Sequence, residues 1–90
     1  MSRIKLRSSV LKFAERMERV LRENDYKGGW QDMLCDELIS RVRDEVIELA
    51  IVVDANMSDE IIKESVDVAN FAMMIADNVS RMAGDKVEYE

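Results

Sequence analysis

Apolar side chains recur every three to four positions along most of the chain, a spacing that predicts amphipathic helices and not strands. We expect a first helix over residues 9–24, a second over 32–54 and a third over 59–82, and the first part of the second could be a separate short helix. The predicted apolar stripes consist of Val10, Phe13, Ala14, Met17, Val20 and Leu21; Cys35, Leu38, Ile39, Val42, Val46, Leu49 and Val53; and Ile61, Val68, Ala72, Ile75 and Val79.

The segments between these helices carry signals of helix ends. Residues 27–30 (KGGW) indicate a turn, because glycine adopts the positive φ angles that end helices. Ser8 or Ser9 and Ser58 are the expected N-caps, and Gly84 the expected end of the third helix. We expect residues 1–8 and 84–90 to be flexible ends.

The pattern therefore predicts a single all-α domain over residues 1–90, with three or four antiparallel helices and short connections. A chain of 90 residues buries a limited fraction of its surface when it folds alone. We therefore expect oligomerisation to complete a four-helix-bundle core.

Cysteine usage and hydropathy indicate a cytoplasmic setting. Cys35 is the only cysteine, which excludes an internal disulfide and suits a reducing compartment, and we interpret it as a small buried hydrophobe. The sequence has no run of about 18 apolar residues, so we expect no membrane association. The first ten residues lack the apolar core of a secretory signal.

Charge is divided unevenly between the two parts of the chain. Residues 1–30 have a net charge of +4 and residues 31–90 a net charge of −10. The acidic body argues against a nucleic acid polymer as the partner. The basic first part could contact phosphates, or could face the acidic helices of its own fold. Histidine is absent, which excludes His-based catalysis and leaves carboxylates with a hard metal ion.

Two pairs of carboxylates lie beside the apolar stripes. Glu45 and Glu48 are three residues apart on the second predicted helix, as are Glu64 and Asp67 on the third. A helix turns about 100° per residue, so in each pair one carboxylate lies at the stripe's edge and the other further out. Antiparallel packing would bring all four together, and Mg²⁺ or Mn²⁺ would neutralise them. The alternative is an ordinary solvated face, with Arg41 pairing with Glu45.

These acids form a pattern that resembles a known family. "EVIE" (45–48), a gap of fifteen residues and "ESVD" (64–67) resemble the E-x-x-E…E-x-x-D signature of the MazG-like nucleoside triphosphate pyrophosphohydrolases, within the all-α NTP pyrophosphatase superfamily. "ENDYKGGW" and "DVANFAMMIADN" are similar to the short, single-domain MazG-like proteins of phages and prokaryotes. The resemblance covers roughly residues 20–80.

The resemblance implies hydrolysis of an NTP or dNTP to a nucleoside monophosphate and pyrophosphate, for removal of aberrant or surplus nucleotides. Glu45, Glu48, Glu64 and Asp67 would bind Mg²⁺, for which Mn²⁺ could substitute. Glu48, ahead of Glu45, is our choice of general base because it lies furthest from the stripe. The family also implies a homodimer or homotetramer.

Five further residues are candidates for contacting the nucleotide. Phe71 could stack on a base or pack in the core, and Trp30 could stack on a base or cap the core of a dimer. Lys27 and Arg41 could touch phosphates, or could be surface charges. Asn78 faces the same seam and could read a base edge.

Two other functions compete with the hydrolase. The small, acidic, amphipathic chain could be a non-enzymatic helical dimer that acts as a regulatory or interaction module. It could also be a degenerate relative that binds nucleotides without cleaving them, although all four acids are present. Dependence on Mg²⁺ separates the enzyme from the interaction module.

Overall fold

The computed structural model describes residues 4–84. Its elements are α1 (Ser8–Glu23), the short 3-10 helix η1 (Asp25–Lys27), α2 (Cys35–Asp54) and α3 (Ser58–Met82). Every regular element in this part of the chain is helical, which confirms the all-α class. The first and third helices begin and end within one residue of the prediction, whereas α2 begins three residues later than predicted.

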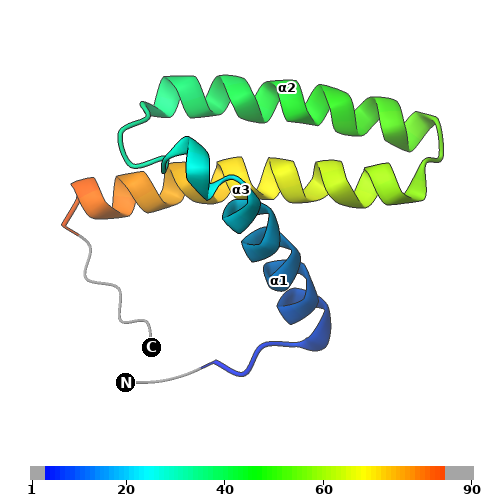
Figure 1. Cartoon of the computed structure of the whole chain (residues 1–90), viewed down its shortest axis with the longest axis horizontal. Coiled ribbons are helices and arrows are strands. Elements are labelled where there is room, and N and C mark those ends of the chain that lie inside the picture. The colour runs from blue at the N-terminus through cyan, green and yellow to red at the C-terminus, as the bar shows by residue number, and fades with distance from the viewer. Residues whose placement is uncertain (1–3, 85–90) are drawn as a thin grey trace.

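The helices form an antiparallel pair crossed by a third. α2 and α3 lie side by side and run in opposite directions (Figure 1). α1 is steeply inclined to this pair, and its last turns pack on the middle of α3. The antiparallel arrangement is therefore confirmed for α2 and α3 and is wrong for α1, which contacts α3 and not α2 within residues 4–84.

The contact between α1 and α3 uses residues outside the predicted stripe of α3. Val66 is only 2% exposed although the sequence did not place it in that stripe. Asn70 is also buried, and its Nδ2 donates a hydrogen bond of 3.3 Å to the backbone oxygen of Met17 on α1. α1 thus rests on a side of α3 different from the one that faces α2.

The helix ends differ in part from the expectation. Arg7 and Met57 occupy the N-cap positions, and neither Ser8 nor Ser58 caps its helix, because each is already the first helical residue. α2 begins after Leu34, whose backbone N–H donates to the Glu37 carboxylate at 2.8 Å.

Two glycines take the conformations that the sequence predicted. Gly28 has a φ of 92° in the turn after η1, and Gly84 has a φ of 69° just after α3. Both lie in the left-handed region that favours glycine. Of the flexible ends predicted at residues 1–8 and 84–90, residues 1–3 and 85–90 fall outside the described residues, and Ser8 is already the first residue of α1.

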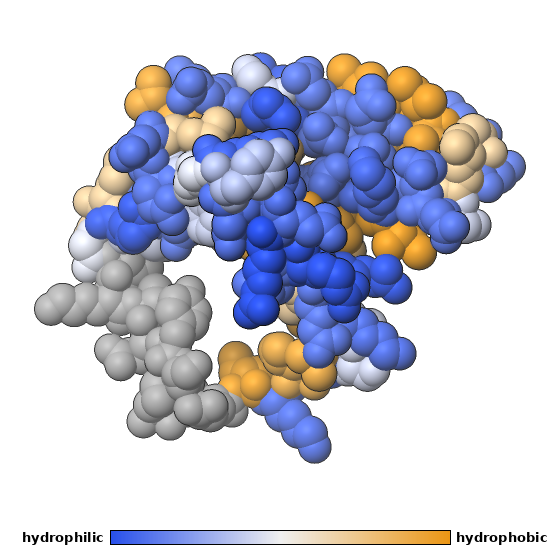
Figure 2. Space-filling view, viewed as in Figure 1, coloured by the Kyte–Doolittle hydropathy of each residue, from blue (hydrophilic) through white to orange (hydrophobic). Residues whose placement is uncertain are grey.

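Few apolar side chains are fully enclosed. Leu38 and Val66 are the buried apolar residues of the described part of the chain, and Cys35 is only half-buried where we expected a buried residue. Figure 2 shows apolar side chains exposed over the end of α2 that leads into α3. None of the described helices combines the length and apolarity needed to cross a membrane.

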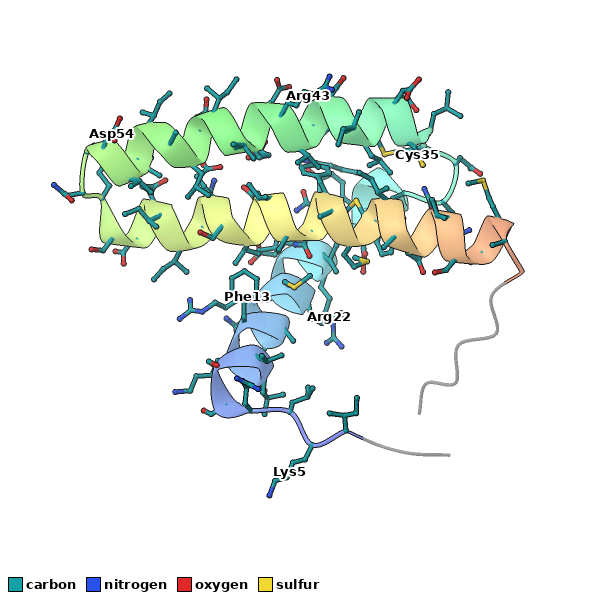
Figure 3. All side chains as sticks on the ribbon, turned by 180° about the vertical axis from the view of Figure 1, so that it is seen from behind. Lys5, Phe13, Arg22, Cys35, Arg43 and Asp54 are labelled. Carbon is teal, nitrogen blue, oxygen red and sulfur yellow. The ribbon has the colours of Figure 1, made fainter. Side chains whose placement is uncertain are left out.

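The predicted stripe of α2 divides between two faces of the helix. Leu38, Val42 and Leu49 are buried or half-buried toward α3. Ile39, Val46 and Val53 are 38%, 47% and 47% exposed. They share the outer side with Arg43, which points away from α3 (Figure 3).

Candidate metal centre

Three carboxylates converge where α2 and α3 face each other. Glu45 on α2 and Glu64 and Asp67 on α3 each offer one oxygen, and these oxygens all lie within 4.8 Å of one another. The antiparallel seam produces this convergence, because Glu45 lies on the same side of α2 as the buried Leu38. The expected convergence of all four acids is wrong for Glu48, which is exposed and lies outside the cluster. Glu48 nevertheless lines a cavity of about 520 Å³ that the other three acids also line.

Glu64 is the most enclosed of these acids. The residue is 8% exposed, and its Oε1 atom has no hydrogen-bond partner among the described residues. Its Oε2 lies 3.4 Å from the Lys63 Nζ. A buried carboxylate oxygen without a partner is costly, because it loses water and gains nothing in return. The Glu64 Oε1 is therefore suited to a positively charged partner from outside the chain.

The burial of these acids, together with their closeness, raises the pKa of Glu45 and of Asp67. Burial raises the pKa of Glu45 to about 7, assisted by a hydrogen bond with Glu64 and by the negative charges of Asp67 and Glu64, while Arg41 opposes the rise. Burial also raises the pKa of Asp67, against the opposing charge of Lys63. Glu45 and Asp67 therefore hold protons more tightly than isolated carboxyls do, and any cation would compete with those protons.

The residues present fit a divalent cation. The donors are carboxylate oxygens, which Mg²⁺ and Mn²⁺ prefer, and the orphaned Glu64 Oε1 needs a positive partner. Lys63 contacts Glu64 and Asp67, but its side chain is 59% exposed and supplies one charge to three acids. Sequence reasoning missed Lys63, although its spacing of four residues from Asp67 could have indicated the pair.

Four of the five predicted nucleotide contacts lie around one neighbouring cavity. Lys27, Trp30, Arg41 and Phe71 line a cavity of about 210 Å³ between the turn after η1 and the helix pair. The Arg41 guanidinium lies 5.1 Å from the centre of the Phe71 ring, in a cation–π contact. We call this space the aromatic cavity.

The aromatic cavity adjoins the carboxylate cluster. Arg41 precedes Glu45 by four residues on α2, and Phe71 follows Asp67 by four residues on α3. Four residues correspond to about 6 Å along a helix. Because α2 and α3 are antiparallel, both displacements point the same way along the pair, so one small molecule could reach both places.

Asn78 does not take the role that the sequence suggested. It is 4% exposed, and its Nδ2 donates to the backbone oxygens of Trp30 and Met33, at 3.0 and 3.2 Å. Its Oδ1 accepts from Arg81. With these groups engaged, Asn78 anchors the loop that carries Trp30 and is not placed to read a base edge.

Asp77 reinforces the same anchor. The Trp30 Nε1 donates to the Asp77 Oδ2 at 2.9 Å, and this bond, with help from Arg81, lowers the pKa of Asp77. Sequence reasoning missed Asp77, because a carboxylate next to a buried amide has no spacing that identifies a partner 47 residues away.

No family model, curated protein or solved structure matches this chain.

Proposed function

We propose that this chain is a metal-dependent nucleoside triphosphate pyrophosphohydrolase of the MazG-like type. One observation carries the proposal: Glu45, Glu64 and Asp67 converge, with a buried oxygen of Glu64 left without a partner. Such an arrangement is unfavourable without a cation and suited to one. The adjoining aromatic cavity supplies a surface for a nucleobase.

The four acids take different roles in this proposal. Glu45, Glu64 and Asp67 hold Mg²⁺ or Mn²⁺, which, when bound, offsets the charge of the triphosphate and polarises its phosphorus. Glu48 is exposed on the same cavity and accepts a proton from the attacking water. The water oxygen bonds to the α-phosphorus, the bond from that phosphorus to the bridging oxygen breaks, and its electron pair leaves with pyrophosphate.

The remaining side chains orient the nucleotide. Phe71 and Trp30 offer ring faces to the base, and Arg41 lies between the aromatic cavity and the carboxylates, where an α-phosphate would pass. Lys27 lies at the turn that closes the cavity. The activity would serve clean-up of the nucleotide pool in a reducing cytoplasm.

The test is release of pyrophosphate from a panel of NTPs and dNTPs, with Mg²⁺ and with chelator. We expect metal-dependent release with the monophosphate as co-product. Glu64→Gln and Asp67→Asn should each lower the rate by more than about 100-fold, because losing a group that binds the metal costs more than losing one that only orients such a group. Asp54→Asn, an exposed change at the end of α2, is the matched control.

Circular dichroism and size-exclusion chromatography of each variant separate the loss of activity from the loss of the fold. If the variants unfold, the acids are needed for the stability of the fold. A folded wild-type chain that releases no pyrophosphate from any nucleotide would reject the proposal.

A second candidate is a non-enzymatic helical module that binds a partner protein. The exposed apolar residues Ile39, Val46 and Val53 on the outer side of α2 favour it. This function needs no metal. An affinity for a partner protein that stays the same when a chelator is added would therefore support it. A degenerate hydrolase would instead bind nucleotide in the presence of metal and leave it intact.

A further inference from the structure

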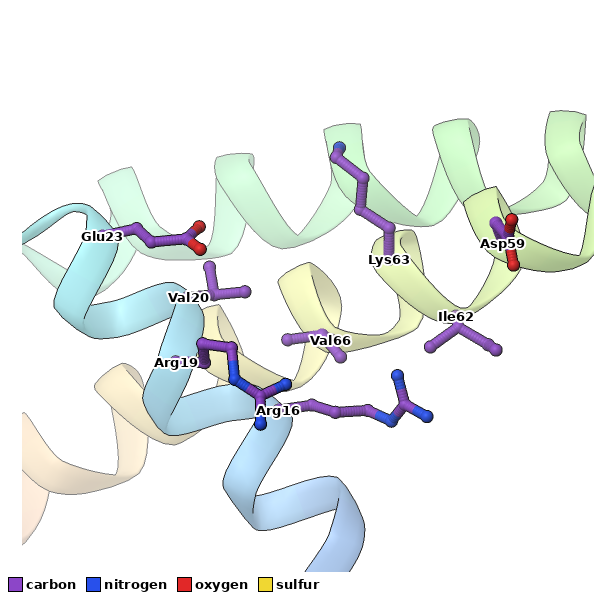
Figure 4. Close-up of a pocket in the computed structure, with 8 residues that line it drawn as sticks. All are labelled: Arg16, Arg19, Val20, Glu23, Asp59, Ile62, Lys63 and Val66. Carbon is purple, nitrogen blue, oxygen red and sulfur yellow. The ribbon is translucent and has the colours of Figure 1, made fainter.

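A basic cavity of about 270 Å³ lies between α1 and the first half of α3, on a side of α3 different from the one that faces α2, and it shares Lys63 with the candidate metal centre. We call it the α1–α3 cavity. Arg16 extends from α1 past Val66 toward Ile62 on α3, and the Arg19 guanidinium lies over α1 in the view of Figure 4. Glu23 lies at one end and Asp59 at the other. The basic groups therefore occupy the middle of the cavity, and the acids its ends.

The two arginines are available to an anion from solution. Neither Arg16 nor Arg19 forms an ion pair within residues 4–84. By contrast, Arg22 pairs with Glu18 and Arg81 with Asp77, each on its own helix. Guanidinium groups bind phosphate oxygens through two parallel hydrogen bonds, which makes arginine well suited to phosphate recognition.

Lys63 connects this cavity with the carboxylate cluster. Its side chain lines both cavities, and its Nζ lies 3.4 Å from Glu64 Oε2 and 3.7 Å from Asp67 Oδ2. Figure 4 shows it turned toward α2, away from the two arginines. A divalent cation bound by Glu64 and Asp67 would repel the ammonium group. The flexible, exposed Lys63 side chain could then turn toward Arg16 and Arg19.

We propose that Arg16, Arg19 and Lys63 bind the phosphate tail of the triphosphate, the two phosphates that leave as pyrophosphate. The substrate assignment rests on the proposed function, but the anion site does not depend on hydrolysis. Positive charge at this place stabilises the negative charge that develops on the departing pyrophosphate. The site also favours a triphosphate over the monophosphate product, which has no group to place there.

The experiment measures the affinity of inorganic pyrophosphate by isothermal titration calorimetry at physiological salt, with and without Mg²⁺. The test variant is Arg16→Gln with Arg19→Gln, and the matched control is Lys5→Gln with Lys12→Gln, which removes the same charge outside the cavity. We expect the test variant to bind pyrophosphate at least about tenfold more weakly than wild type, because it loses charge-assisted hydrogen bonds. The control should change by less than about twofold, since distant charges are screened.

Two further measurements test the role of the two arginines. Arg16→Lys with Arg19→Lys keeps the charge without the planar fork, so it should recover part of the affinity. If the wild type is active, the KM for the triphosphate should rise at least about tenfold in the glutamine variant, in parallel with the lost affinity. Circular dichroism confirms that each variant is folded.

The outcomes separate this inference from the proposed function. A glutamine variant that binds pyrophosphate as tightly as wild type overturns the inference, even if the chain hydrolyses nucleotides. Arginine-dependent binding of pyrophosphate by a chain that hydrolyses nothing supports the anion site and rejects the hydrolase.

Discussion

The ionisation of Glu45 is governed by neighbours on two helices. A glutamate at the edge of an apolar stripe usually reaches water, but here the pairing of α2 with α3 covers it and places Glu64 and Asp67 beside it. Burial and those neighbours raise its pKa to about 7, above the ordinary value of 4.5. Between these two pH values the folded chain holds a proton that the unfolded chain releases.

The first prediction follows from the sign of this difference. Because the folded state binds more protons, the free energy of unfolding of the metal-free protein should fall as pH rises from about 4.5 to about 7. Glu45→Gln should flatten this dependence. Urea denaturation in chelator across pH 4.5–8 measures it, with Glu48→Gln, an exposed change, as control. A flat wild-type profile would contradict the raised pKa.

The second prediction concerns Glu64. Removing its charge relieves repulsion with Glu45 and Asp67, so Glu64→Gln should stabilise the metal-free protein by about 1–3 kcal/mol. Millimolar Mg²⁺ or Mn²⁺ should raise the Tm of the wild type, because the ion binds the folded state, and should leave the Tm of the variant almost unchanged. Thermal melts with and without metal check both effects. If the metal raises the Tm of both proteins equally, Glu64 does not bind the metal.

At the scale of elements, one side of α3 holds the loop between η1 and α2. This loop carries Trp30 and has little regular structure, so its position depends on bonds to α3. Asn78 donates to two loop carbonyls, and Asp77 accepts from the Trp30 indole. The aromatic cavity therefore exists only while these side chains hold the loop in place.

The third prediction tests that anchor. Asn78→Ala leaves two loop carbonyls without their donor and should destabilise the fold by about 1–3 kcal/mol. Trp30 fluorescence should shift to longer wavelength as the indole becomes more exposed. Asn24→Ala is the control, since Asn24 also donates to a backbone oxygen but is exposed. Identical effects of the two changes would mean that Asn78 does not hold the loop.

These elements also show what the sequence could predict. Period and glycine signals placed the three helices, because helix formation depends on neighbours along the chain. The convergence of Glu45, Glu64 and Asp67 followed from spacing plus an antiparallel pair. The direction of α1 did not follow, because an apolar stripe identifies a face and not its partner. Its contact depends on Val66 and Asn70, whose burial only the assembled fold reveals.

At the scale of the whole molecule, the described chain leaves much apolar surface in contact with water. Ile39, Val46 and Val53 recur every seven residues along the outer side of α2, which gives a continuous apolar edge. A heptad stripe of this kind is suited to a second helix packed alongside. The same face on a second copy would provide that helix, and two hairpins joined in this way would give the four-helix bundle expected from the sequence.

The last prediction is therefore that the protein self-associates through the outer side of α2. Val46→Lys would place a charge at the centre of this edge and should shift the protein to monomer, because burying an uncompensated charge costs more than a small interface returns. Ile51→Lys is the control: Ile51 is 56% exposed, but it lies on a different side of α2. Sedimentation equilibrium across a range of concentrations measures the association. If both variants remain associated, the interface lies elsewhere. If the wild type is already monomeric, the exposed edge of α2 is not a self-association surface. That edge then becomes the first place to look for another partner.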